Sequence, residues 1–314
     1  MVLAPMADVT DVSFRYVIAK YGKPSVMWTE FVSADGLVLA PEAGKQKLLK
    51  DLLYSEIERP IVAQLFSSKP ENMEKACKLV RELGFDGVDI NMGCPDKSIE
   101  RQGCGSAMIK NPSLAKEVIA AAKRGAGDMP VSVKTRLGYN TDELEAWLPI
   151  LLSAEPAVIT IHARTRKEMS KVPARWERIK RAVEIRDELK SETLIFGNGD
   201  VEDVAAARKK VEETGADGVM IGRGIFGNPF LFSERADVTP QERLNALLEH
   251  TKIYNEKLGG TKSFHIMKKH FKSYLKQIPD SKELCAALMN TENAGEVEVL
   301  INEFLKLNSK SLNS

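Results

Sequence analysis

Short apolar runs alternate with longer helix-forming segments along most of this 314-residue chain, and this alternation constrains the fold most. Runs of apolar and β-branched residues predict eight strands, at 2–5, 26–32, 60–66, 87–93, 130–138, 157–164, 193–199 and 218–224. Helical spacing and good helix formers mark segments 70–83, 113–124, 142–153, 176–190 and 201–214. Such alternation implies a parallel sheet. Eight units over about 230 residues match a (β/α)8 TIM barrel, whereas an open doubly wound sheet normally has fewer strands.

The strand pattern ends near residue 233, and a helical tail follows. Pro240 suits the first turn of a helix, so we predict two domains, a barrel over 1–238 and a helical domain over 239–314. One tail helix has an apolar stripe, made of Phe264, Met267, Phe271 and Tyr274. Its other stripe is basic, made of His265, Lys269, Lys272 and Lys276. The basic stripe predicts either a solvated face or a contact with an RNA backbone.

Composition restricts the possible partners and the compartment. The formal net charge is only +1, so the overall balance gives no indication of a nucleic-acid partner. The four cysteines have neither CxxC nor metal-ligand spacing, which predicts reduced thiols and a cytoplasmic protein. No apolar run approaches the ~20 residues that span a bilayer, and we expect no membrane association. His250, His265 and His270 lack metal-ligand spacing, so we expect surface or RNA-facing side chains and no metal.

Polar residues close successive predicted strands. These residues are Gln64, Asn91, Lys134 and Arg136, His162, and Asn198-Gly199-Asp200. In a TIM barrel the carboxyl ends of the strands meet at one mouth, where the active site is built. A single residue of this kind is usually a solvated strand end, but their joint occurrence favours an active site.

A second signal follows the eighth strand, where Ile221-Gly222-Arg223-Gly224 offers backbone N–H groups and a guanidinium to an anion. The loops after strands seven and eight are the usual phosphate site of a TIM barrel. The pattern does not fit GxGxxG, so a mononucleotide such as FMN fits better than a dinucleotide. Lys134 would then stabilise the negative charge of the reduced flavin, and Gln64 would hydrogen-bond the same edge.

The segment Asp89-Ile90-Asn91-Met92-Gly93-Cys94-Pro95 ends an apolar strand in a turn that presents a cysteine beside an asparagine amide. A thiol in this place can take part in chemistry. Cys104 lies ten residues later in a glycine-rich loop and is the alternative reactive thiol. Cys77 and Cys285 lie in apolar helical patterns and are expected to be buried.

The pattern Asn91-x-Gly93-Cys94-Pro95, followed by Lys97 and by Gly103-Cys104-Gly105-Ser106-Ala107, resembles the tRNA-dihydrouridine synthase family. Further segments resemble its motifs in the expected order, namely Ala4-Pro5-Met6, Ala63-Gln64-Leu65, His162-Ala163-Arg164-Thr165, Asn198-Gly199-Asp200 and Gly222-Arg223. Members of this family are flavoenzymes that reduce a uracil base in tRNA. Lys97 favours the bacterial B-type enzymes.

The resemblance implies roles for individual residues. FMN would contact Pro5, Met6, Ala7, Gln64, Lys134, His162, Asn198, Gly199, Asp200, Gly222 and Arg223. Cys94 would be the general acid, with Asn91 holding the base. We expect the substrate to contact Asn91, Lys97, Arg136, Arg164, Lys268, Lys269 and Lys272.

The resemblance also implies the reaction. NADPH or NADH reduces FMN, and hydride passes from flavin N5 to C6 of uracil while the Cys94 thiol protonates C5. The uridine must be flipped out of the folded tRNA to reach the barrel mouth. The helical tail, with Lys268-Lys269-His270, resembles the family's tRNA-binding domain and would hold the RNA. We expect a monomer.

Two other functions are compatible with parts of this pattern. An FMN-dependent TIM-barrel oxidoreductase acting on a free pyrimidine or another small molecule would share the phosphate loops and Lys134, but would not need residues 239–314. A non-catalytic RNA-binding protein would use the basic helix alone. The joint presence of Cys94, Lys134, His162 and Arg223 argues against that second alternative.

Overall fold

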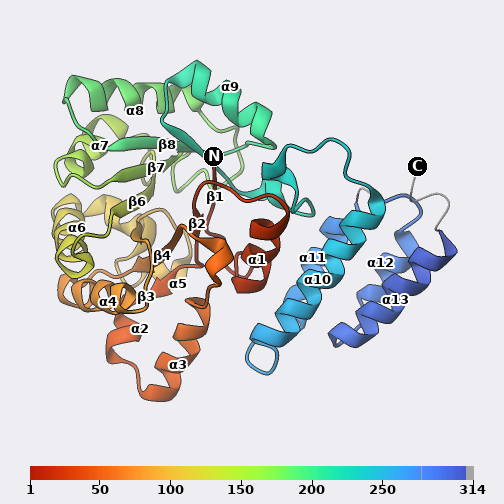
Figure 1. The fold of residues 1–314 in the computed structure, drawn as a ribbon. Coiled ribbons are helices and arrows are strands. Elements are labelled where there is room, and N and C mark those ends of the chain that lie inside the picture. Colours follow the sequence, from red (N-terminus) through yellow and green to blue (C-terminus); the bar gives the residue numbers. More distant parts are fainter. Residues whose placement is uncertain (277, 309–314) are drawn as a thin grey trace.

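A ring of parallel strands forms the core of the larger part of the molecule in the computed structural model, which describes residues 1–276 and 278–308 (Figure 1). The strands are β1 (Val2–Leu3), β2 (Met27–Trp28), β3 (Val32–Ser33), β4 (Ile61–Phe66), β5 (Gly87–Asn91), β6 (Val131–Arg136), β7 (Val158–His162), β8 (Leu194–Asn198) and β9 (Gly218–Ile221). They pair in the order β1-β9-β8-β7-β6-β5-β4-β2. The Leu3 N–H donates to the Val26 carbonyl at 3.3 Å, which joins β1 to the start of β2. The predicted TIM barrel is therefore confirmed.

The predicted strand at 26–32 is divided in two. Both β2 and β3 pair with β4, and residues 29–31 lie between them. The Thr29 hydroxyl accepts the Gln64 backbone N–H at 3.1 Å and donates to the Glu30 carbonyl at 2.8 Å. The Thr29 side chain thus accepts the Gln64 N–H, which a backbone carbonyl would accept in a regular ladder. The strand is interrupted there.

Helices surround the barrel. They are α1 (Val12–Tyr21), α2 (Ala34–Leu39), α3 (Glu42–Asp51), α4 (Pro70–Glu82), α5 (Lys97–Glu100), α6 (Pro112–Ala126), α7 (Leu144–Leu152), α8 (Trp176–Glu188) and α9 (Val204–Thr214). Short 3₁₀ turns add η1 (Glu56–Glu58), η2 (Gly105–Lys110), η3 (Arg223–Ile225) and η4 (Leu231–Ser233). All five predicted helices between strands are present. The helix predicted from 201 begins later because the Asp203 side chain caps it, accepting from the Ala206 N–H at 2.7 Å.

Apolar side chains between the strands and the helices form the main core. Val88, Ile90, Val133, Ile159 and Ile161 are fully buried there. Parallel strands are covered on both faces, so their sequences are nearly continuous apolar runs. Polar residues in these strands, which interrupt the apolar pattern, therefore lie inside the barrel or at its mouth.

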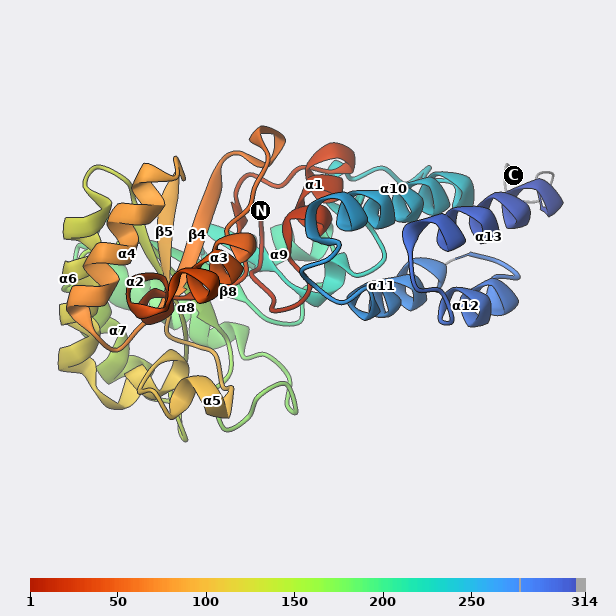
Figure 2. The same cartoon turned by 90° about the horizontal axis from the view of Figure 1, so that it is seen from below.

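The predicted helical tail begins at Pro240, and it extends from one side of the barrel (Figure 2). Its helices are α10 (Pro240–Leu258), α11 (His265–Leu275), α12 (Lys282–Leu288) and α13 (Ala294–Leu307). Thr239 and Glu242 form a capping box that fixes the start of α10. Val12 and Val17 of α1 belong to the same apolar cluster as the tail, so the barrel and the tail share this packing.

The predicted apolar stripe of α11 is confirmed, since Met267, Phe271 and Tyr274 are buried and Phe264 is half-buried. The expectation that three tail histidines lie at the surface is wrong for His250 and His270. Both are buried in the described structure, with ring centroids 5.6 Å and 5.3 Å from that of Phe14. The physical reason is that α1 packs over this face of α10 and α11.

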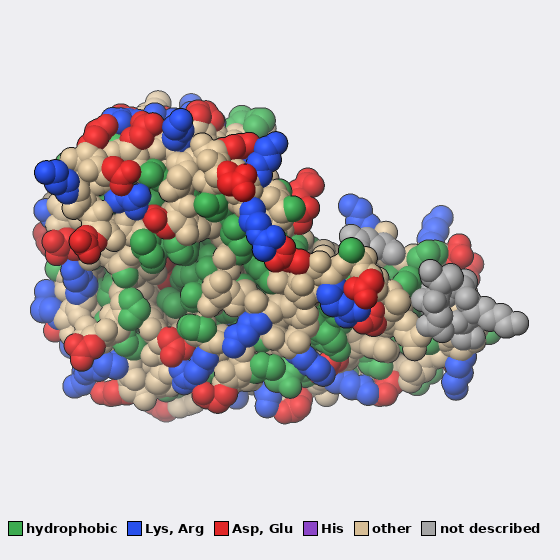
Figure 3. Space-filling view, turned by 45° about the horizontal axis from the view of Figure 1, so that its top comes forward, with side chains coloured by type: hydrophobic (Ala, Val, Ile, Leu, Met, Phe, Trp, Pro, Cys, Tyr) green, Lys and Arg blue, Asp and Glu red, His purple; other side chains and the backbone are tan. Residues whose placement is uncertain are grey.

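The protein surface mixes charges of both signs. On the face in Figure 3, Lys and Arg side chains alternate with Asp and Glu, in keeping with the small net charge. Among the described residues, no helix has the length and apolar character needed to cross a membrane. Within the same part of the chain, no group of three or more His, Cys, Asp or Glu side chains is arranged to hold a metal ion.

Candidate active site

A cavity of about 560 Å³ opens at the carboxyl ends of the barrel strands. Most of the residues predicted to contact the cofactor line it, namely Pro5, Met6, Lys134, His162, Asn198, Gly199, Asp200, Gly222 and Arg223. Gln64 does not line this cavity but an adjoining one, and Ala7 faces a third cavity beside the tail. Strands that are distant in sequence thus bring nine of the eleven predicted residues together.

A smaller cavity of about 160 Å³ adjoins the first, because Pro5 and Lys134 line both. Its remaining lining residues are Phe31, Gln64, Asn91, Gly93, Cys94, Pro95 and Arg136. Phe31 was not predicted for the site, because it lies inside the interrupted strand. The arrangement places the Cys94 thiol in a compartment of its own beside the larger cavity.

Local hydrogen bonds fix the turn that carries Cys94. The Asn91 side-chain oxygen accepts from the backbone N–H groups of Gly93 and Cys94, at 3.1 and 2.9 Å. The Cys94 carbonyl accepts from both the N–H and the hydroxyl of Ser106, each at 2.9 Å. Gly105 has φ +60°, and a Cβ there would lie 2.6 Å from the Cys94 carbonyl oxygen. The glycine-rich segment after the turn therefore supports it from behind.

The two candidate thiols differ in their surroundings. Cys94 is partly exposed and lines the small cavity, where burial raises its pKa, so the thiol keeps its proton at neutral pH. Cys104 is 1% exposed and packs with Phe66 and Ile99. Only Cys94 of this pair is placed to meet a molecule in the cavities.

Positive charge concentrates where the two cavities meet. Lys134 Nζ lies 3.4 Å from the Asn198 side-chain oxygen, and burial, reinforced by Arg136, lowers the Lys134 pKa to about 8. Arg136 is buried and donates to the carbonyls of Gly93 and Thr165 at 2.7 and 3.2 Å. A buried cation that remains protonated near neutral pH can stabilise negative charge on a bound ring.

The opposite end of the larger cavity suits an anion. The Arg223 guanidinium is 64% exposed and lies 3.4 Å from Asp200, so it can turn to another partner. A Cβ on Gly222 would approach only Ala4 and Met6, at 3.7 and 3.9 Å, so this backbone is open to a ligand. Asp200 is itself compensated by an ion pair with Arg164, which holds the pKa of this carboxyl below its usual value.

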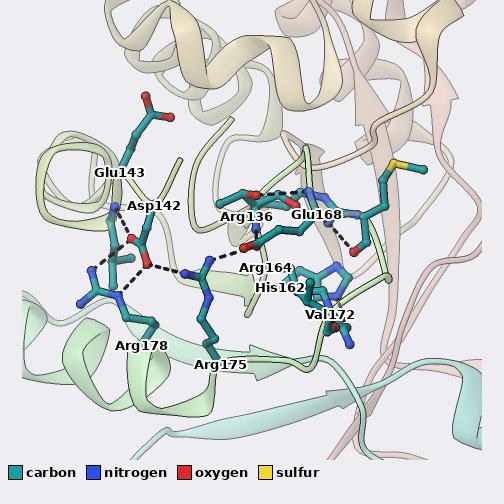
Figure 4. Close-up of polar contacts among 12 residues, drawn as sticks. Arg136, Asp142, Glu143, His162, Arg164, Glu168, Val172, Arg175 and Arg178 are labelled. Atoms are coloured by element: carbon teal, nitrogen blue, oxygen red, sulfur yellow. Dashed lines mark hydrogen bonds and ion pairs between the residues drawn. The ribbon is translucent and has the colours of Figure 1, made fainter. Parts of the chain in front are cut away.

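Arginines hold the loop between β7 and α8 over the mouth (Figure 4). Arg164 donates to the Val172 carbonyl at 2.5 Å, and its guanidinium lies 3.1 Å from His162 Nε2. Burial lowers the pKa of His162 well below its usual value, so its ring is neutral and can accept from Arg164. Arg175 lies 3.0 Å from Glu168 and fixes the far side of the loop. These internal partners account for the burial of Arg164, which lines the larger cavity together with residues predicted to contact the cofactor.

The remaining residues predicted to contact the substrate are spread more widely. Asn91 and Arg136 line the small cavity, and Lys97 begins the short helix after the cysteine turn. Lys269 and Lys272 are exposed on α11, whereas Lys268 forms an ion pair with Glu292 at 3.0 Å and is 13% exposed. The four residues of the predicted basic stripe, His265, Lys269, Lys272 and Lys276, are all exposed, and Lys268 lies outside that stripe.

The sequence analysis missed Asp89, which lies in β5 beside Gln64, a residue of the small cavity. It accepts from the Gln64 amide at 2.6 Å and from the Ser132 hydroxyl at 2.5 Å. Its position in an otherwise apolar strand was the available signal, because a charged residue in a buried strand needs partners.

Comparison with known proteins agrees with this geometry. The family model described as Dihydrouridine synthase (Dus) matches residues 2–309. A relative from Bacillus subtilis (strain 168), named "Probable tRNA-dihydrouridine synthase 2", is 44% identical and covers 96% of this chain and 93% of its own length. A Staphylococcus aureus (strain COL) relative, named "Probable tRNA-dihydrouridine synthase", is 42% identical, with 96% and 92% covered.

Solved structures share the fold at much lower identity. Morphinone reductase in complex with tetrahydroNAD has a TM-score of 0.51 at 14% identity, covering 78% of this chain and 86% of that one. Histamine dehydrogenase from Rhizobium sp. 4-9 has a TM-score of 0.54 at 13% identity, covering 81% of this chain and 48% of that one. At such identities the likeness concerns the barrel architecture alone.

Proposed function

This chain belongs to the dihydrouridine synthase family, and from that premise we propose that it reduces the C5–C6 double bond of uridine in tRNA, with Cys94 as the general acid. The observation that carries the role of Cys94 is the pair of adjoining cavities. One presents the Cys94 thiol, whose pKa burial raises, and the other is bounded by the half-buried Lys134 ammonium and the exposed Arg223 guanidinium.

The larger cavity fits FMN. Gly222 and Arg223 would hold the phosphate, with Asn198 and Gly199 beside them, and Pro5 and Met6 would lie against the ring. Lys134 would meet the pyrimidine edge of the ring, where its charge favours the reduced form. When bound, FMN supplies hydride chemistry, with NADPH or NADH as the source of electrons.

The small cavity fits the uracil base. Its walls bring Asn91, Cys94 and Arg136 within reach of one molecule, and Lys134 closes the side toward the larger cavity. The Cys94 Sγ proton would go to C5 of the base. A thiol whose pKa is raised by burial holds that proton at neutral pH and can release it when charge develops on the carbon.

The helical tail would bind the rest of the tRNA. We propose that residues 239–314 contact the RNA and that residues 1–238 bind the cofactor. Lys269 and Lys272 offer exposed positive charge on α11 to the RNA phosphates. Such backbone contacts would offset the free-energy cost of unstacking the target uridine. We also propose that the enzyme acts as a monomer in the cytoplasm. Its four cysteines are free thiols, which agrees with a reducing compartment.

The test measures dihydrouridine by nucleoside mass spectrometry after incubation of unmodified tRNA with the protein, FMN and NADPH. We expect product with the wild type and a loss of about 100-fold or more in Cys94→Ala, the range for removal of a general acid. Cys104→Ala is the matched control and should retain activity. If NADPH reduces the bound flavin but no tRNA gives product, a free pyrimidine or another small molecule would be the substrate.

A further inference from the structure

Asp89 is a buried carboxylate in β5, two residues before Asn91, which ends the strand and lines the small cavity. It is 1% exposed, and the strand register places it beside Gln64 of β4 and Ser132 of β6. It accepts one hydrogen bond from each of them, at 2.6 and 2.5 Å. Burial raises its pKa to about 6, so it remains mainly ionised at neutral pH. An apolar side chain would be the favourable filling for a barrel interior, so the charge requires another explanation.

The charge of Asp89 fixes the orientation of two amide side chains, first that of Gln64 and through it that of Asn91. An ionised carboxylate only accepts hydrogen bonds, so the Gln64 NH₂ group must face Asp89. The Gln64 oxygen then faces Asn91, whose NH₂ group donates to it at 3.0 Å. The Asn91 oxygen is left to accept from the N–H groups of Gly93 and Cys94. Turning either amide over would place two donors or two acceptors against each other.

We propose that Asp89 is a positioning residue, which acts through Gln64 and Asn91 to fix the turn that carries Cys94. The same relay decides which atom Gln64 offers to the small cavity that it lines. Asp89 itself lines neither cavity. The functional meaning of the relay rests on the proposed role of Cys94, but the relay can be tested without catalysis.

Asn91→Asp is the first test. The new carboxylate still accepts from the Gly93 and Cys94 N–H groups, but its second oxygen faces the Gln64 oxygen. Turning the Gln64 amide over relieves that contact and creates the same conflict at Asp89. We expect amide hydrogen exchange at residues 93 and 94 to accelerate about tenfold, as for the loss of one buried charge-assisted hydrogen bond.

The double variant Asp89→Asn with Asn91→Asp reverses the direction of the relay. The introduced asparagine donates to a turned Gln64 oxygen and accepts from the Ser132 hydroxyl, while Gln64 donates to the new carboxylate. Every donor again faces an acceptor, so exchange at residues 93 and 94 should return to the wild-type rate. Gln64 is expected to hydrogen-bond the flavin edge that Lys134 meets, and Lys134 lines both cavities. Because Gln64 remains turned in the double variant, FMN affinity should be reduced, by about tenfold for one mismatched hydrogen bond.

Ser132→Ala is the matched control. It removes the other partner of Asp89 and leaves the direction of the relay intact, so exchange at residues 93 and 94 should not change. Wild-type exchange in a folded Asn91→Asp protein would overturn the proposal. So would a double variant that remains unprotected or does not fold, and wild-type FMN affinity in that variant would overturn the part concerning Gln64. Protection that follows this pattern in a protein that makes no dihydrouridine would reject the proposed function and leave the relay standing.

Discussion

Lys262 connects the tail to the barrel mouth, and its replacement by methionine should destabilise the protein in a pH-dependent way. It lies between α10 and α11, and its Nζ is 2.9 Å from Glu30 and 2.7 Å from Asp51. The contact with Asp51 is an ion pair without the alignment of a hydrogen bond. Glu30 is 6% exposed and also accepts the Asp8 N–H at 2.5 Å. Lys262→Met therefore leaves a buried carboxylate without its cation.

The magnitude follows from how deeply the pair is buried. Breaking a fully buried ion pair costs about 3–5 kcal/mol, and an exposed pair contributes about 0–1 kcal/mol. The Lys262 side chain is 18% exposed, which screens the pair in part and places the expected loss at about 2 kcal/mol near pH 8.

The pH dependence has a definite sign. Burial already raises the pKa of Glu30, and loss of Lys262 raises it further. The variant's penalty is complete above that higher folded-state pKa and is relieved as the pH falls and Glu30 takes up a proton. The loss of stability should therefore be smaller at pH 5 than at pH 8.

Urea unfolding of the wild type and Lys262→Met at pH 5 and pH 8 measures this difference, with Lys262→Arg as the control that keeps the charge. An equal loss at both pH values would show that packing of the alkyl chain, and not the ion pair, accounts for the effect. A loss below about 0.5 kcal/mol at pH 8 would refute the reasoning, because it would equal that of an ordinary surface substitution.

Three further predictions concern the tail and the helices of the barrel. Burial lowers the pKa of His250 to about 4 from the usual 6.5. Below pH 6.5 the unfolded chain therefore takes up a proton that the folded protein does not, and the free energy of unfolding should fall by about 3 kcal/mol as the pH approaches 4. His250→Phe should reduce this acid sensitivity in urea titrations at pH 7 and pH 4. Lys269→Gln should weaken tRNA binding and lower its salt slope by about 1, whereas Lys268→Gln, which removes a lysine already paired within the tail, should change the slope less. Gly125→Ala should lower the free energy of unfolding by about 3 kcal/mol, and with it the thermal midpoint, since the added Cβ would lie 2.1 Å from the Glu74 carbonyl oxygen; an unchanged midpoint would mean that α4 and α6 separate easily.

Local patterns in the sequence predicted the elements whose causes are local. Apolar runs and helical spacing predicted the strands and five of the barrel helices in their order, and Thr239-Pro240 marked the start of the tail. Helices α1, α2, α3 and α5 were not predicted. Strand 26–32 could not be predicted as two strands, because the interruption depends on Thr29 accepting from Gln64 of another strand. The burial of His250 and His270 depends on α1, which is more than 200 residues away from them in sequence.

For the site, the sequence determined which chemical groups are present and that strand ends would bring them to one mouth. The family resemblance indicated the cofactor and the substrate, and the motif around Cys94 led to the proposal that Cys94 is the acid. Only the tertiary structure decided that Cys104 is packed away from the cavities and that Arg164 pairs internally. It also placed Asp89 beneath the cysteine turn, with the direction of each hydrogen bond set. The physical reason is that periodicity and motifs are properties of neighbours along the chain, whereas burial, pKa and hydrogen-bond direction depend on groups that meet across the barrel.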